Sequence, residues 1–509
     1  MSTETTNFVR PSGGALTKRW LHALSLAAVV LASVHVCAAP MGPEEARLLL
    51  SRTGFAATAD SVKVWSQLSR ERAVDRLLAD SRTTAITPPP GWVNDFVPRR
   101  EFRDATDAQK KELQRRELTK SLELRAWWMQ EMLLTPSPLT ERMTLFWHNH
   151  FVSSQQKVKS PVLMYRQNVL LRRYALGRFG DLLHAVSKDP AMIFYLDNAS
   201  NRRAQPNENF AREVMELFTL GEGHYSERDI KEAARAFTGW SIEPDTGTFK
   251  FRYFQHDDGV KTVLGRSGNF DGDDVLNILL AQPSTAELIT AKLWREFVSP
   301  EPDPAAVKRL ASRFRDSGYD IKVVLRGLLT SPALYATENR GTLIKSPVDL
   351  TVGTLELFQV ETGELTPFAV LNAALGQNLF APPNVKGWPG GESWINSTTL
   401  LARKQFLDRL FRAQDMRGDS QAMMAAFRGG GGGGIKNPAK LGEQMRGRFI
   451  EALSEIHFDE PRWTARLAGD PRAITRLVLA TEPVNPIDPD LRGIDLIRAL
   501  TQDPAYQLK

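Results

Sequence analysis

Histidine and carboxylate side chains are concentrated between residues 148 and 257 of the chain. The first group is His148-Asn149-His150. Residues two apart on an α-helix point about 160° apart, so these imidazoles share a metal ion only if the helix ends near Trp147. The alternative is one histidine on a helix face and one that packs or caps the helix end. The spacing therefore predicts either a metal-ligand pair or two structural histidines.

A second group of polar residues lies within residues 207–218. On a helical wheel, one arc holds Asn209 and the charged residues Glu208, Arg212, Glu213 and Glu216. Arg212 is four residues from both Glu208 and Glu216, so we expect it to lie between these two carboxylates. The arc has no lysine, and apolar residues cover the rest of the wheel, which favours a mostly buried helix whose acidic groups need a cation. A surface helix with ion pairs is the alternative.

From this pattern, Glu208 and Glu216 are predicted metal ligands together with the histidines, and the metal would be a divalent ion. Glu213 is a predicted catalytic acid or base, and Arg212 is predicted to bind a carboxylate or phosphate of the substrate.

Two turns carry further histidines. His224 follows two glycines in a turn that could bring its imidazole next to Glu216 as a catalytic base. His256 and Asp257 lie in the turn Gln-His-Asp-Asp-Gly, where they are either ligands or solvated side chains.

A proline- and glycine-rich loop at residues 381–396 contains Trp388 and Trp394. Exposed tryptophans bind sugars or peptides, so both are predicted substrate contacts. Tryptophans packed beneath a rigid loop are the alternative.

The composition is that of a globular protein, with 42% hydrophobic and 24% charged residues in 509. The formal net charge is +6, and no block of lysine and arginine is present, so a nucleic-acid partner is not expected. The single cysteine, Cys37, excludes a disulfide framework and cysteine-based zinc or iron–sulfur sites. Phosphate-binding loops and dinucleotide fingerprints are lacking, so no nucleotide cofactor is expected.

The first 38 residues resemble a secretory signal peptide. Lys18 and Arg19 precede an apolar stretch over residues 20–36, and Ala38 ends a small-residue cleavage pattern. A membrane anchor is the alternative, but about 17 residues is short for a span. We therefore expect a periplasmic or secreted protein with no stable membrane span after signal removal.

Most of the remaining chain shows helical periodicity. The pattern predicts helices over residues 44–51, 62–78, 107–134, 141–151, 163–189, 207–240, 273–280, 286–298, 305–317 and 321–329. Residues 246–254 and 262–264 predict one β-hairpin.

The predicted fold class is mostly α, because no βαβ alternation is present. We expect a large multi-helix body over residues 39–428 with the small hairpin. Six consecutive glycines at 429–434 predict a linker to a small helical C-terminal region at 435–509.

Several long strings resemble, in order, those of a bacterial family known as domain of unknown function 1800 (DUF1800). They are residues 141–151, 188–192, 207–213, 216–221, 237–240 and 382–391. The resemblance runs from about Glu44 to the C-terminus, with one departure at Ala56, where a glycine is expected. It implies an exported, largely helical protein whose gene often accompanies one for another exported family, domain of unknown function 1501 (DUF1501). It implies no particular reaction.

Three functions fit these observations. The first is a metal-dependent hydrolase of the envelope or extracellular space. The second is a non-enzymatic envelope or secretion factor that binds a co-exported partner, for which the DUF1501 protein is the candidate. The third is a glycan-cleaving enzyme that uses two carboxylates without a metal.

Overall fold

The computed structural model describes residues 39–412 and 455–509. The predicted signal peptide, the glycine linker and residues 435–454 lie outside the described residues. The described residues from Met41 onward form one compact unit.

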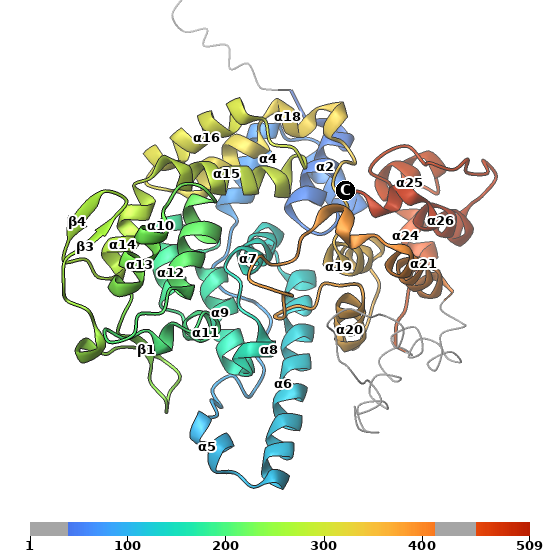
Figure 1. Cartoon of the computed structure of the whole chain (residues 1–509). Helices are drawn as coiled ribbons and strands as arrows, with labels where there is room; N and C mark the ends of the chain where they lie inside the picture. Colours follow the sequence, from blue (N-terminus) through green and yellow to red (C-terminus); the bar gives the residue numbers. More distant parts are fainter. Residues whose placement is uncertain (1–38, 413–454) are drawn as a thin grey trace, which may run out of the picture. The chain divides into compact units, whose positions relative to one another are not determined.

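The described residues fold mostly into helices, which confirms the predicted fold class (Figure 1). The α-helices are α2 (Gly42–Thr53), α3 (Ala59–Trp65), α4 (Arg70–Ala79), α5 (Arg99–Asp104), α6 (Asp107–Leu134), α7 (Pro138–His150), α8 (Gln155–Val158), α9 (Pro161–Tyr174), α10 (Phe179–Ser187), α11 (Pro190–Tyr195), α12 (Asn209–Glu213), α13 (Glu227–Ala236), α14 (Gly272–Leu280), α15 (Pro283–Phe297), α16 (Pro304–Asp316), α17 (Ile321–Leu329), α18 (Pro332–Tyr335), α19 (Pro347–Phe358), α20 (Thr366–Ala374), α21 (Ser397–Phe411), α24 (Glu460–Ala465), α25 (Pro471–Val478) and α26 (Gly493–Gln502). Short helical turns are η1 (Asn198–Ser200), η3 (Tyr253–Gln255), η4 (Thr337–Asn339), η5 (Gly391–Trp394) and η7 (Pro504–Gln507), and η2 (Val214–Leu220) is a π-helix.

Local sequence signals explain where several helices begin and end. Thr106 and Gln109 form a capping box at the start of α6, which has the predicted bounds. The helix predicted over residues 62–78 is instead split into α3 and α4, because the Ser69 hydroxyl accepts a hydrogen bond from the Arg72 amide and starts a new helix. Among the described residues, no helix is long and apolar enough to cross a membrane.

The β-structure consists of two small hairpins where one was predicted. Strand β1 (Trp240–Ile242) pairs with β2 (Phe249–Phe251), and β3 (Lys261–Val263) pairs with β4 (Arg266–Gly268), both antiparallel. Leu264 and Gly265 both have positive φ, so they form the tight two-residue turn that closes β3 directly onto β4. This turn explains why residues 262–264 do not pair with residues 246–254.

Buried polar contacts fix α7 between α6 and α9. The Glu141 carboxylate accepts hydrogen bonds from Arg172 Nε and Nη2 at 2.6 and 2.8 Å and from Trp128 Nε1 at 2.8 Å. Trp147 Nε1 donates to the Ala175 carbonyl at 2.9 Å. These contacts hold the end of α7, which carries the His148-Asn149-His150 group.

The described C-terminal residues pack on α19. Trp463 Nε1 donates to the Leu357 carbonyl at 2.7 Å, and the hydroxyls of Thr354 and Tyr506 lie 2.8 Å apart. The Lys509 ammonium donates to the buried carboxylate of Asp349 at 2.8 Å. The chain end is therefore part of the packed body.

Candidate functional site

The acidic segment is α-helical only up to Glu213. From Val214 to Leu220 the chain forms the π-helix η2, and the Thr219 hydroxyl donates back five residues to the Val214 carbonyl at 2.6 Å. A π-helix has more residues per turn than an α-helix, so residues four apart no longer align, and such segments are frequent at functional sites. The predicted continuous helix over residues 207–240 is thus interrupted at the acidic group.

The π-helix changes the partners of Arg212. Its guanidinium donates to both carboxylate oxygens of Glu227 at 2.7 and 2.9 Å and lies 3.7 Å from Glu208. Glu227 raises the pKa of Arg212 through these hydrogen bonds. The expected contact with Glu208 is present, but Glu227 takes the place expected for Glu216, because the wider turn rotates Glu216 away.

Glu216 and Glu213 form an acidic pair with a tyrosine. Tyr225 Oη donates to Glu216 Oε2 at 2.6 Å, and the pKa of Tyr225 is raised by burial and by Glu216. Glu213 is half-buried, and its pKa is raised by burial first and by the charge of Glu216 second. Arg212 and Lys386 act on this pKa in the opposite direction. We call Glu213, Glu216 and Tyr225 the acid centre.

His224 is exposed, and the hydroxyl that reaches Glu216 belongs to the next residue, Tyr225. Tyr225 was missed as a functional residue, although it lies in the same glycine-bearing turn. The turn at residues 221–225 does bring a side chain to Glu216 as expected, but this side chain is Tyr225 and not His224. A catalytic role for His224 stays a prediction.

The tryptophan loop lies close to the acid centre. Asn149 Oδ1 accepts from the Trp388 amide at 2.7 Å, and Asn149 Nδ2 donates to the Trp388 carbonyl at 3.3 Å. Lys386 of this loop lies 3.8 Å from Glu222. Trp388 and Trp394 are buried, as in the packing alternative, so neither presents an exposed platform to a substrate.

We expect Gly387→Ala to weaken this docking. Gly387 has φ +82°, and a Cβ there would lie 2.3 Å from Asn149 Oδ1. Gly390 has φ +75° and ψ −172° with no atom within 4 Å of its Cβ position, so Gly390→Ala adds the backbone strain alone, about 1–3 kcal/mol. Urea unfolding should show a larger loss of stability for Gly387→Ala. Equal losses in the two variants would contradict the Asn149 contact.

The two histidines of α7 lie in different surroundings, because the helix continues to His150. The ring of His148 is buried against Trp128, Phe380 and Trp388, and burial lowers its pKa to about 3. The condition for a shared ion, a helix that ends near Trp147, is therefore not met.

His150 and Lys292 contact backbone carbonyls of the π-helix η2. Lys292 Nζ lies 3.0 Å from both His150 Nδ1 and the Leu217 carbonyl. Because the ammonium donates to Nδ1, the proton of the neutral imidazole is on Nε2, which donates to the Phe218 carbonyl at 3.2 Å. Burial and Lys292 lower the pKa of His150 well below its ordinary value, and burial lowers that of Lys292 to about 8. Lys292, on α15, was not singled out from the sequence.

Within residues 39–412 and 455–509, no three histidine, cysteine, aspartate or glutamate side chains gather as ligands for one ion. Both ring nitrogens of His150 are engaged by Lys292 and Phe218. Glu208 lies beside Arg212, and Glu216 accepts from Tyr225. The four predicted ligands thus contact different partners, and their metal-binding role stays a prediction.

Comparison with known proteins decides the family. The family described as "Protein of unknown function (DUF1800)" matches residues 48–508. The chain belongs to this family. No curated protein and no solved structure matches it at a significant level.

Some residues in the DUF1800 strings have structural roles. Glu141 pairs with Arg172, as described above. Asp189 is buried and caps α11 by accepting from the Met192 amide at 3.1 Å and from Gln167 Nε2 at 2.8 Å. Burial raises the pKa of Asp189 to about 7.

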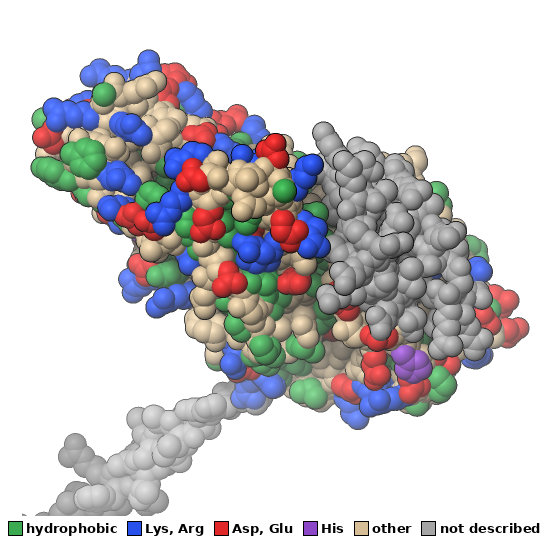
Figure 2. All heavy atoms as spheres, turned by 90° about the horizontal axis from the view of Figure 1, so that it is seen from below, with side chains coloured by type: hydrophobic (Ala, Val, Ile, Leu, Met, Phe, Trp, Pro, Cys, Tyr) green, Lys and Arg blue, Asp and Glu red, His purple; other side chains and the backbone are tan. Residues whose placement is uncertain are grey.

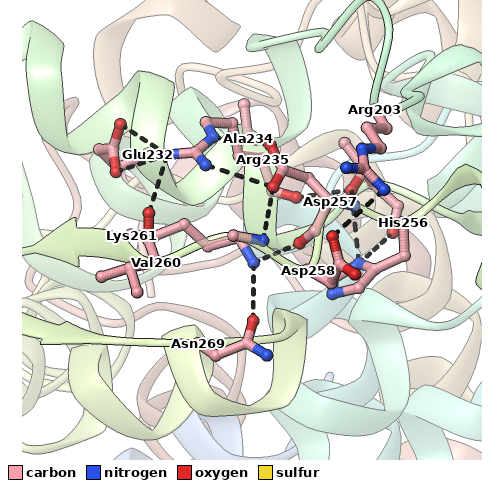
Figure 3. A network of polar contacts seen from close by, with 12 residues as sticks. Arg203, Glu232, Ala234, Arg235, His256, Asp257, Asp258, Val260, Lys261 and Asn269 are labelled. Carbon is pink, nitrogen blue, oxygen red and sulfur yellow. Dashed lines mark hydrogen bonds and ion pairs between the residues drawn. The ribbon is translucent and has the colours of Figure 1, made fainter.

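The His256-Asp257 turn of this DUF1800 protein is an ion-pair network (Figure 3). Arg235 Nε donates to Asp257 at 2.7 Å, and Arg235 Nη1 donates to Glu232 at 3.0 Å. His256 is buried with Nδ1 2.9 Å from the Thr238 carbonyl. Asp257 and His256 are thus engaged within the fold and are not simply solvated, and a ligand role for them stays a prediction.

Proposed function

We propose that this protein is an exported hydrolase whose acid centre performs general acid–base chemistry. The observation that carries the proposal is the pairing of a half-buried Glu213 with a raised pKa and a Glu216 that accepts a hydrogen bond from Tyr225. Two neighbouring carboxyl groups in different environments are the arrangement that divides acid and base roles. The export part of the proposal rests on the sequence of residues 1–38.

In this proposal each carboxyl group has a separate role. Glu213 keeps its proton to higher pH and donates it to the leaving group. Glu216 acts as the general base that accepts the proton of the attacking water, with Tyr225 fixing its position. Lys386, whose charge already reaches Glu213, lies where it can contact a polar substrate. A glycosidic bond fits best, because its hydrolysis needs one acid and one carboxylate.

A divalent metal is the alternative at the same place. Glu213 and Glu216 offer oxygen donors, which suit magnesium, calcium or manganese better than zinc. His150 cannot join them in this structure, because both of its nitrogens are engaged.

If the reaction is acid–base catalysis without a metal, elemental mass spectrometry of the protein purified without chelator should find no stoichiometric metal. Hydrolysis of a panel of nitrophenyl glycosides should continue in the presence of EDTA. Two results together would contradict this proposal and support a metal-dependent reaction. They are about one equivalent of bound metal that is lost in Glu216→Gln, and inactivation by EDTA.

A binding role with a co-exported DUF1501 partner is the second candidate. The burial of Trp388 and Trp394 favours it, because the loop then lacks an exposed aromatic surface for a small substrate. Co-purification of both exported proteins, with equal affinity for wild type and Glu213→Gln, would support this role if no substrate is cleaved.

A further inference from the structure

A short segment next to the hairpins exposes several large apolar side chains. Tyr253 and Phe254 are 73% and 77% exposed, and Val260 and Phe251 are 67% and 42% exposed. Single exposed apolar residues are common on proteins, but a cluster of them marks an interaction surface. We call these four residues the aromatic turn.

The ion-pair network contacts the backbone of the aromatic turn, and Figure 3 shows this contact at Val260. Arg235 Nη1 donates to the Val260 carbonyl at 3.2 Å, and Asp257 Oδ1 accepts from the Gly259 amide at 2.9 Å. The Phe251 ring packs on His256 with centroids 5.4 Å apart. The exposed side chains are therefore presented on a fixed backbone, which reduces the entropy lost on binding.

Basic residues surround the aromatic turn. The Arg203 amide donates to the Gln255 carbonyl at 2.8 Å, which joins the Arg202-Arg203 segment to the residue that follows Phe254. Four basic side chains lie near the turn: Arg202, Arg203, Lys250 and Arg252. Arg203 is paired with Asp258 at 3.2 Å and Lys250 with Glu243, whereas Arg202 and Arg252 form no ion pair with a described residue. Figure 2 shows hydrophobic and basic side chains next to one another at its left, the side that carries β3 and β4 in Figure 1. The surroundings thus have a surplus of positive charge.

We propose that the aromatic turn binds the surface of an anionic phospholipid bilayer. Tyrosine and phenylalanine rings enter the interfacial region of a bilayer, and neighbouring arginines pair with lipid phosphates. A stable protein interface takes about 20–30 residues on each side. Attachment to a bilayer surface can use a smaller area, because its strength is the sum of the buried apolar area and the attraction of basic residues to anionic lipids. This inference does not depend on the hydrolase function.

Vesicle sedimentation with the mature protein tests the proposal. We expect binding to vesicles that contain phosphatidylglycerol, little binding to pure phosphatidylcholine, and weaker binding as salt rises. The affinity of the double variant Tyr253→Ala/Phe254→Ala for these vesicles should be lower than that of wild type by a factor of about ten or more. Arg202→Gln/Arg203→Gln should bind more weakly and with a smaller salt dependence.

The matched control is Leu134→Ala/Val484→Ala, which removes two other large apolar side chains, 58% and 66% exposed. This control should bind like wild type, and circular dichroism should show that all three double variants are folded. Absence of binding to phosphatidylglycerol vesicles, or equal binding by the Tyr253→Ala/Phe254→Ala variant, would overturn the proposal. So would a concentration-dependent dimer, without vesicle binding, that the same variant abolishes.

Discussion

Replacing Glu213 by glutamine is expected to reduce turnover by about 10²–10⁴-fold, the usual contribution of a general acid. Glutamine keeps the shape of the side chain but cannot donate the proton. Because Glu213 is only half-buried and has a raised pKa, the neutral amide should leave the fold intact. The measurement is kcat on the nitrophenyl glycoside that the wild-type protein cleaves fastest.

Glu222→Gln is the matched control, since this carboxylate lies in the same segment with a side chain that is 77% exposed. It should keep wild-type turnover. If Glu213→Gln and Glu222→Gln are equally active, the acid centre is not catalytic. A wild-type protein that cleaves no glycoside, ester or peptide would remove the hydrolase proposal as a whole.

The pH dependence of the same reaction follows from the sign of the shift. In the proposed reaction the protonated form of Glu213 is the active one, so the rate should fall as pH rises through its raised pKa. Part of that shift comes from Glu216, so Glu216→Gln should move the alkaline limb of any residual activity to lower pH. If the alkaline limb of the pH–rate profile does not move in Glu216→Gln, the titrating group is a residue other than Glu213.

Removing the buried carboxylate of Asp349 is expected to lower the free energy of unfolding by about 3–5 kcal/mol. Asp349 accepts from Arg142, from Lys509 Nζ at 2.8 Å and from the Ser346 amide at 3.0 Å. All three charged side chains are buried, so Asp349→Ala leaves two cations without their shared partner. Urea unfolding at neutral pH measures the loss.

Asp75→Ala is the control for Asp349→Ala, because the Asp75–Arg326 pair is exposed and such pairs contribute about 0–1 kcal/mol. Arg142 and Lys509 hold the pKa of Asp349 far below its ordinary value. Its stabilisation is therefore complete above the unfolded-state pKa of about 3.9 and is lost as pH falls below that value. The stability difference between wild type and Asp349→Ala should shrink in acid.

Local sequence patterns were sufficient for most of the fold. Helix α6 follows from its helical periodicity and from Pro136 and Pro138 after it, and the opposite directions of His148 and His150 follow from helical geometry. The separation of α3 from α4 depends on one serine that also fits inside a helix, so periodicity alone did not show it.

The acid centre could be predicted only in part. Glu213 and Glu216 stand out by residue type, but the π-helix depends on Lys292 and His150, which hold its carbonyls from distant helices. No pattern within residues 207–221 contains that information. The same reason explains why Tyr225 was missed and why Arg212 was expected beside Glu216.

The π-helix also has a consequence for chain length. A π-helical turn holds one residue more than the α-helical turn that it replaces. A segment one residue shorter between Val214 and Leu220 would close as an ordinary α-helix and bring Glu216 back over Arg212. Tyr225 would then lose its acceptor, whereas Glu213 would keep Glu216 as a neighbour, because residues three apart face one another on an α-helix. The hydrogen bond between Tyr225 and Glu216 therefore depends on one extra residue in the segment as much as on the identity of the two side chains.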